Sequence, residues 1–167
     1  VLIIFVGFGG LRYWDTVQTN KSKDAAVSFE SVLELLNKGE KEKAKGLIKN
    51  IKLDFPNLAY TQLAMLLEAH ILVTENNYRD AEEVLLELIG TDPIKGLAQV
   101  AASRLARLYL AQKKPKKAME VISGKLLDKV EGDLWELRAD IAAAMGENEK
   151  ALALYDHALE QSQLLGY

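Results

Sequence analysis

Two histidines, His70 and His157, are the residues best suited to acid–base or metal chemistry in a chain that has no cysteine. A metal site needs three or four convergent ligands, and neither histidine has a second one at helical spacing. Two isolated histidines also give no serine–histidine–aspartate arrangement. We therefore predict no metal site and no cofactor, and expect both histidines to be partly exposed helix residues.

The glycine-rich stretch Gly7-Phe-Gly-Gly10 is the other segment that resembles a chemical motif. A dinucleotide-binding fingerprint would need a third glycine where the chain has Arg12, and a strand before it. The many carboxylates fall in expected turns and on solvated helix faces. These observations predict a protein that is not an enzyme and has no small-molecule substrate.

Composition favours one packed domain that binds something other than nucleic acid. The 167 residues are 49% hydrophobic and 27% charged, which provides a core and argues against disorder. The net charge of −3 offers no basic surface for a phosphate backbone. We therefore expect no nucleic-acid partner.

Apolar residues recur at three- and four-residue steps along most of the chain, which predicts an all-α fold. Short turns containing glycine, proline or asparagine separate the helices, which we expect to form four antiparallel pairs. The predicted helices are 22–37, 40–53, 58–75, 78–89, 94–112, 115–128, 133–145 and 147–165.

Four segments of the expected turns echo one another. They are 39–44, 76–81, 113–118 and 146–151, and each ends on an alanine. These alanines, at positions 44, 81, 118 and 151, are separated by 37, 37 and 33 residues (81 − 44, 118 − 81 and 151 − 118). A recurring period in the mid-thirties indicates a helical solenoid, a class that mostly presents binding surfaces to other proteins.

Aligned on these alanines, the pairs resemble the tetratricopeptide repeat. That family has a small residue eight positions into the first helix, where the two helix backbones approach closely. The positions that match it hold Val32, Ala69, Ala106 and Ala139. The resemblance implies a tetratricopeptide-like solenoid that binds proteins.

The first residues, 1–11, form an unbroken apolar run that ends at Arg12, Tyr13 and Trp14. As a helix, such a run spans roughly 16 Å, about half of a hydrocarbon core. We expect residues 1–14 to be the end of a transmembrane helix with Arg12, Tyr13 and Trp14 at the interface, 15–21 a stalk, and 22–167 the repeat domain. A buried core helix is the alternative.

The whole chain also resembles a narrower family, the YfgM-like ancillary subunits of the bacterial Sec translocon. The likeness is carried by the segments 11–14, 60–69, 104–108, 137–140 and 146–151 in this order. It implies a single-pass inner-membrane protein with its repeat domain in the periplasm. Its implied partners are the Sec translocon, a periplasmic chaperone and exported client proteins.

One face of the first helices is the candidate partner-binding surface, and we call it the first-helix face. It comprises Leu63, Leu66, His70, Val73, Val100, Ser103, Arg107, Leu110, Asp133, Glu136, Asp140 and Ala143. Only Arg107, helped by Arg104, suits a carboxylate, so the clamp used by some cytosolic cochaperones is absent. The face grades from apolar to acidic, which fits an extended apolar or basic segment, or a partner domain.

Other functions stay open at this level. Arg12, Lys21 and Lys23 follow the apolar run, and positive charge normally stays cytoplasmic, which favours a scaffold for another membrane complex. A soluble tetratricopeptide adaptor and a soluble enzyme using a helical groove are further alternatives. The basic run 113–117 is expected to be a solubilising turn, or else a contact for acidic headgroups or an acidic loop.

Overall fold

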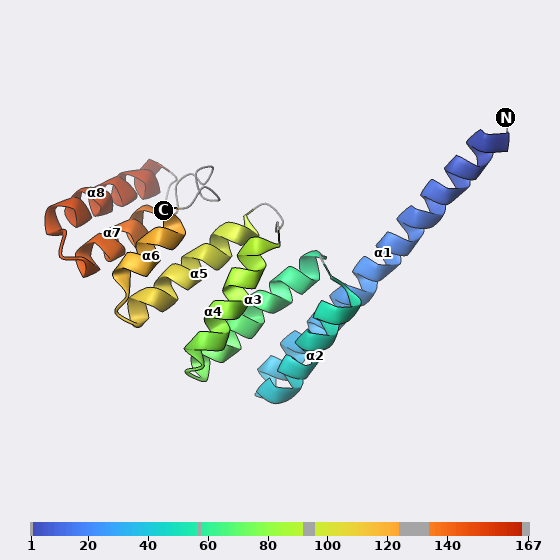
Figure 1. Cartoon of the computed structure of the whole chain (residues 1–167), viewed down its shortest axis with the longest axis horizontal. Helices are drawn as coiled ribbons and strands as arrows, with labels where there is room; N and C mark the ends of the chain where they lie inside the picture. Colours follow the sequence, from blue (N-terminus) through green and yellow to red (C-terminus); the bar gives the residue numbers. More distant parts are fainter. Residues whose placement is uncertain (1, 57, 92–95, 124–133, 165–167) are drawn as a thin grey trace. The chain divides into compact units, whose positions relative to one another are not determined.

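The computed structural model describes residues 2–56, 58–91, 96–123 and 134–164, except for the side chains of residues 2–18 and 164 (Figure 1). These ranges contain eight α-helices and no strand, so the prediction of an all-α fold is confirmed. The helices are α1 (Leu2–Asn37), α2 (Lys41–Asp54), α3 (Ala59–Thr74), α4 (Tyr78–Gly90), α5 (Leu97–Ala111), α6 (Pro115–Ile122), α7 (Trp135–Ala144) and α8 (Asn148–Leu164).

Most helix ends agree with the predicted ones to within a few residues. The clearest difference is at α1, which already begins at Leu2, so residues 15–21 are helical and the expected start at Ser22 lies inside the helix. At α5 the helix begins at Leu97 after Gly96, whose φ is 95°. The predicted residues 124–128 of the sixth helix and Asp133 of the seventh fall outside the described residues.

The four echoing segments form the same turn. Each begins with a residue of positive φ, namely Gly39 (76°), Asn76 (60°), Lys113 (59°) and Gly146 (81°). The amide of the next residue then donates to a carbonyl five positions back, as from Glu40 to Leu35 (2.9 Å) and from Lys114 to Tyr109 (2.8 Å). This is the Schellman arrangement, which satisfies the last carbonyls of one helix just before the next helix begins. The recurrence in sequence is therefore a recurrence of one backbone turn.

The small residues that the repeat pattern singled out are buried. Val32, Ala69, Ala106 and Ala139 are each at most 2% exposed, and the alanines that close the turns are at most 4% exposed. Side chains of this size let neighbouring helix backbones approach closely. The close packing at these positions therefore explains why small residues recur there.

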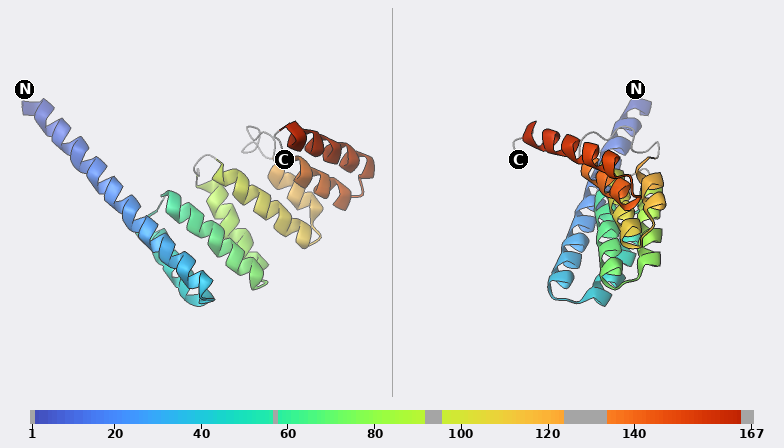
Figure 2. Two further views of the ribbon diagram at one scale, coloured as in Figure 1. Left: turned by 180° about the vertical axis from the view of Figure 1, so that it is seen from behind. Right: turned by 90° about the vertical axis from the view of Figure 1, so that its left-hand side faces the viewer.

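The chain divides into two compact units, Val1–Ile71 and Leu72–Tyr167, and the boundary falls within α3. In unit 1, α1 and α2 pack side by side, as both views of Figure 2 show. The core of unit 1 is built from Val32, Ala44, Ile48, Ile51, Ala64 and Ile71. Phe29, Leu36 and Leu47 cover this core as half-buried neighbours.

In unit 2, each helix from α4 to α7 contacts the next one in the chain, and α5 also contacts α7. This second contact places the two first helices next to each other. The largest fully buried side chains of the unit are Leu85, Leu88, Leu105, Ile122, Leu137 and Ile141. The core of unit 2 therefore runs between successive helices, as stacking of repeats requires.

Within the described residues, no helix combines the length and the apolarity needed to cross a bilayer. The predicted remnant of a transmembrane helix stays a prediction.

Candidate docking face on the first helices

The first-helix face has separate members in the two units. In unit 1, Leu63 is half-buried and His70 is exposed, whereas Leu66 is only 5% exposed and packs in the core. All three lie on α3. Leu66 therefore contributes packing, and of these three side chains His70 offers the most exposed surface.

In unit 2, the contact between α5 and α7 brings two further sets of predicted residues onto adjacent helices. On α5, Val100 and Arg107 are exposed and Leu110 is half-buried, but Ser103 is buried at 9% exposure. The α7 set consists of Glu136 and Ala143, both exposed, and the half-buried Asp140. Val73, at the end of α3, is 36% exposed. Asp133 lies outside the described residues.

The α7 carboxylates already have neighbours on α8. The hydroxyl of Tyr155 donates a hydrogen bond of 2.6 Å to Oδ1 of Asp140, and this bond raises the pKa of the tyrosine. A carboxylate has two oxygens, so Asp140 keeps capacity for a second, basic partner. Asp140, at the acidic end of the first-helix face, thus helps to join α7 to α8. The spacing of residues along the sequence did not predict this contact.

An aromatic cluster adjoins this end of the face. The rings of Trp135 and His157 meet edge to face with their centroids 4.2 Å apart, and the guanidinium of Arg138 lies 5.3 Å from the centroid of Trp135. Nδ1 of His157 is also 3.7 Å from a carboxylate oxygen of Glu160. His157 is thus half-buried against α7, as expected for a partly exposed helix residue.

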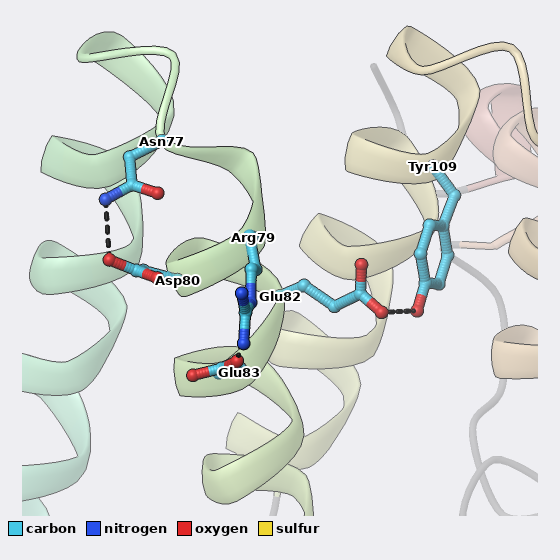
Figure 3. Close-up of polar contacts among 6 residues, drawn as sticks. All are labelled: Asn77, Arg79, Asp80, Glu82, Glu83 and Tyr109. Atoms are coloured by element: carbon cyan, nitrogen blue, oxygen red, sulfur yellow. Dashed lines mark hydrogen bonds and ion pairs between the residues drawn. The ribbon is translucent and has the colours of Figure 1, made fainter.

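A second polar contact joins first and second helices, between α4 and α5. Figure 3 shows the hydroxyl of Tyr109 donating to Oε1 of Glu82 over 2.8 Å. Burial, and then the hydrogen bond to this carboxylate, raise the pKa of Tyr109 to about 12. Sequence reasoning missed this pair because its members are 27 residues apart, with no local pattern linking them.

The other contacts drawn in Figure 3 are local to the start of α4. Nδ2 of Asn77 donates to Asp80 over 2.6 Å, and Arg79 pairs with Glu83 over 3.2 Å. Asp80 lies in the first turn of the helix, where a negative charge is favoured by the helix dipole.

Across the part of the chain that the structure describes, no group of three or more histidine and carboxylate side chains is placed to hold a metal ion. His70 belongs to unit 1 and His157 to unit 2. The arrangement offers surfaces for binding, with side chains of both charges and apolar patches.

The basic run 113–117 forms the turn between α5 and α6. Lys113 has the positive φ of the turn, Pro115 begins α6, and Nζ of Lys117 lies 5.3 Å from the ring centroid of Tyr109. These roles agree with the interpretation as a solvated turn. Arg12, Tyr13 and Trp14 lie on the α1 helix, and only their backbone is described.

Comparison with known proteins agrees with this geometry. A protein of Aggregatibacter actinomycetemcomitans named ancillary SecYEG translocon subunit is 28% identical over 169 residues, which covers 98% of this chain and 80% of the relative. The predicted resemblance to the ancillary translocon subunits is therefore confirmed.

Among solved structures, pilF of Pseudomonas aeruginosa superposes with a TM-score of 0.52 at 18% identity, covering 85% of this chain and 78% of that one. This likeness shows the fold alone. The family model of the tetratricopeptide repeat-like domain matches residues 1–165. With the repeated turns and buried small residues, this match shows that the chain belongs to the family of the tetratricopeptide repeat-like domain.

Proposed function

We propose that this chain is an ancillary subunit of the Sec translocon that acts by binding proteins and not by catalysis. The observation that carries the proposal is the match to the ancillary SecYEG translocon subunit, because it extends over 98% of the chain. The helical repeat fold supports it, since stacked helix pairs present extended surfaces to other proteins.

We further propose that the first-helix face binds exported chains or a periplasmic chaperone. On unit 2 this face combines exposed Val100 with the opposite charges of Arg107 and Glu136. Such a surface suits an extended segment that carries apolar side chains and basic groups near α7. His70 and Leu63 are the corresponding candidates on unit 1.

We propose that α1 anchors the chain to the bacterial inner membrane with the repeats in the periplasm. The apolar residues 1–11 and the interface residues Arg12, Tyr13 and Trp14 support an anchor. A phosphatase that is active only after export, fused after Tyr167, tests the orientation. We expect the fusion to show phosphatase activity in intact cells. An inactive fusion that is present in full length would contradict the periplasmic placement.

Crosslinking in membranes tests the function itself. A photoreactive residue is placed at Val100 or Arg107 in the full chain, with Glu120 on α6 as an exposed control position. We expect translocon components, a chaperone or exported chains among the adducts from the first-helix face and fewer from Glu120. Adducts without any translocon component would contradict the assignment.

A second candidate function is a cytoplasmic scaffold for another membrane complex. The positive charges of Arg12, Lys21 and Lys23, which follow the apolar run, favour that orientation. The same phosphatase fusion separates the two functions, because it reports which side of the membrane carries the repeats.

A further inference from the structure

A groove of about 540 Å³ lies between α2 and α3 in unit 1. We call it the lysine groove, and its lining includes Lys45, Gly46, Lys49, Lys52, Leu53 and Glu68. We propose that the lysine groove binds an acidic segment of a partner protein, with carboxylates alternating with apolar side chains.

The lysines of the groove lie on one face of α2. Lys45, Lys49 and Lys52 are four and three residues apart, the spacing that aligns side chains along a helix. Lys45 contacts Glu42 at 2.6 Å, and Lys52 contacts Glu68 across the groove at 3.5 Å. Lys49 between them is exposed, so an incoming carboxylate can reach it without displacing either ion pair.

Charge along α2 differs from charge along the whole chain. Lys41–Asp54 contains five lysines and two acidic residues, a net charge of +3 (5 − 2), whereas the entire protein carries −3. The groove lining itself holds three lysines and two glutamates, a net charge of +1 (3 − 2). Positive charge in a protein of opposite net charge attracts acidic partners and increases the rate of their encounter.

The groove also has an apolar part. A Cβ placed on Gly46 would meet no atom within 4 Å, so this residue leaves open space beside the lysine stems. Leu53 is 69% exposed at the same groove. Apolar side chains of a bound segment can therefore pack over Gly46 and Leu53 while its carboxylates contact Lys49.

A protein segment fits this groove better than a membrane surface does. Glu42 and Glu68 pair with two of the lysines, Lys45 and Lys52, so the groove presents Lys49 as a local site for a single carboxylate and not a broad cationic surface for a layer of headgroups. A groove between two helices also admits a narrow chain more readily than a flat bilayer.

The test uses the full chain and a fluorescently labelled peptide of four Asp-Leu repeats, with a Lys-Leu peptide as the charge control. Binding is followed by fluorescence anisotropy at low and at physiological ionic strength. We expect Lys49→Glu to weaken binding about fivefold, since it converts an exposed ion pair into a repulsion. Lys43→Glu changes the net charge equally but lies outside the groove lining, and less than about a twofold effect is expected.

Gly46→Leu is the second variant, because it fills the open space and improves the helix propensity of α2. We expect unchanged helicity and at least about tenfold weaker peptide binding, because the leucine side chain occupies the space that the apolar side chains of the peptide would fill. Equal binding of the Asp-Leu and Lys-Leu peptides, or equal effects of the Lys49 and Lys43 variants, would overturn the proposal. So would Lys49-dependent binding to phosphatidylglycerol vesicles without binding of the acidic peptide. None of these results bears on the first-helix face, whose residues are different.

Discussion

The hydroxyl of Tyr109 on α5 donates a hydrogen bond of 2.8 Å to the Glu82 carboxylate on α4. Tyr109 as a whole residue is 5% exposed, and its hydrogen bond to Glu82 is partly buried. The contact joins the second helix of one pair to the first helix of the next, and so it links neighbouring repeats within unit 2.

Replacing Tyr109 with phenylalanine should lower the free energy of unfolding by about 1–2 kcal/mol near pH 8, because a hydrogen bond to a charged acceptor is lost. The pKa of Tyr109 is about 12 in the folded chain, above the ordinary value of 10. The stabilising contribution is therefore complete below pH 10 and is lost as the pH rises toward 12.

Urea unfolding of the wild type and Tyr109→Phe between pH 8 and 11.5, roughly the window of these two pKa values, measures the effect. The difference in stability should shrink as the pH rises. Glu82→Gln, which keeps an acceptor but removes the charge, serves as control, and a difference that stays constant with pH would contradict the assigned role.

The left-handed backbone conformation of Lys113 leads us to expect that glycine at this position stabilises the chain. Its φ of 59° is left-handed, whereas the equivalent turn residues Gly39 and Gly146 have no Cβ to strain. Lys113→Gly should raise the free energy of unfolding by about 1 kcal/mol. Lys116→Gly, inside α6, should lower it by a similar amount, and equal signs for the two variants in urea unfolding would refute the interpretation.

Gly46 and Gly146 provide a matched test of backbone conformation. An added Cβ meets no atom within 4 Å at either position, but only Gly146 has a positive φ, of 81°. Gly46→Ala should stabilise the chain by about 0.5–1 kcal/mol, and Gly146→Ala should destabilise it by about 1 kcal/mol. Chemical unfolding of both variants measures these opposite signs.

The packing around Ala106 is predicted to exclude a larger side chain at this position. It is fully buried in α5, whereas Ala111 at the end of the same helix is exposed. Ala106→Leu should cost about 1–3 kcal/mol through overpacking, and Ala111→Leu should change the stability by less than about 0.5 kcal/mol. Similar melting temperatures for the two variants would show that α5 and its neighbours can separate without loss.

Arg107 tests the first-helix face. Arg107→Glu reverses an exposed charge and should reduce crosslinking to the partners by about fivefold without changing the melting temperature. Lys116→Glu on α6 makes the same change of charge on a second helix and should leave crosslinking intact. An equal loss in both variants would indicate dependence on net charge, and no loss in either would argue against this face.

The local sequence determined the helices and the turns between them. Spacing of apolar residues is read within one helix, and the four echoing segments contain the Schellman turn in consecutive residues, so both could be predicted. The small residues at Val32, Ala69, Ala106 and Ala139 were also predictable, because close packing of two helices recurs at one position of each repeat.

Only the tertiary structure decided which side chains meet across helices. Tyr109 and Glu82 are 27 residues apart, and Tyr155 and Asp140 are 15 apart. A shift of one position along the helix rotates a side chain by about 100°. For this reason Leu66 and Ser103, which the repeat alignment assigned to the first-helix face, are buried in the structure, while Arg107 and Glu136 are exposed. The repeat period specifies the fold, but the rotation of each helix specifies the surface.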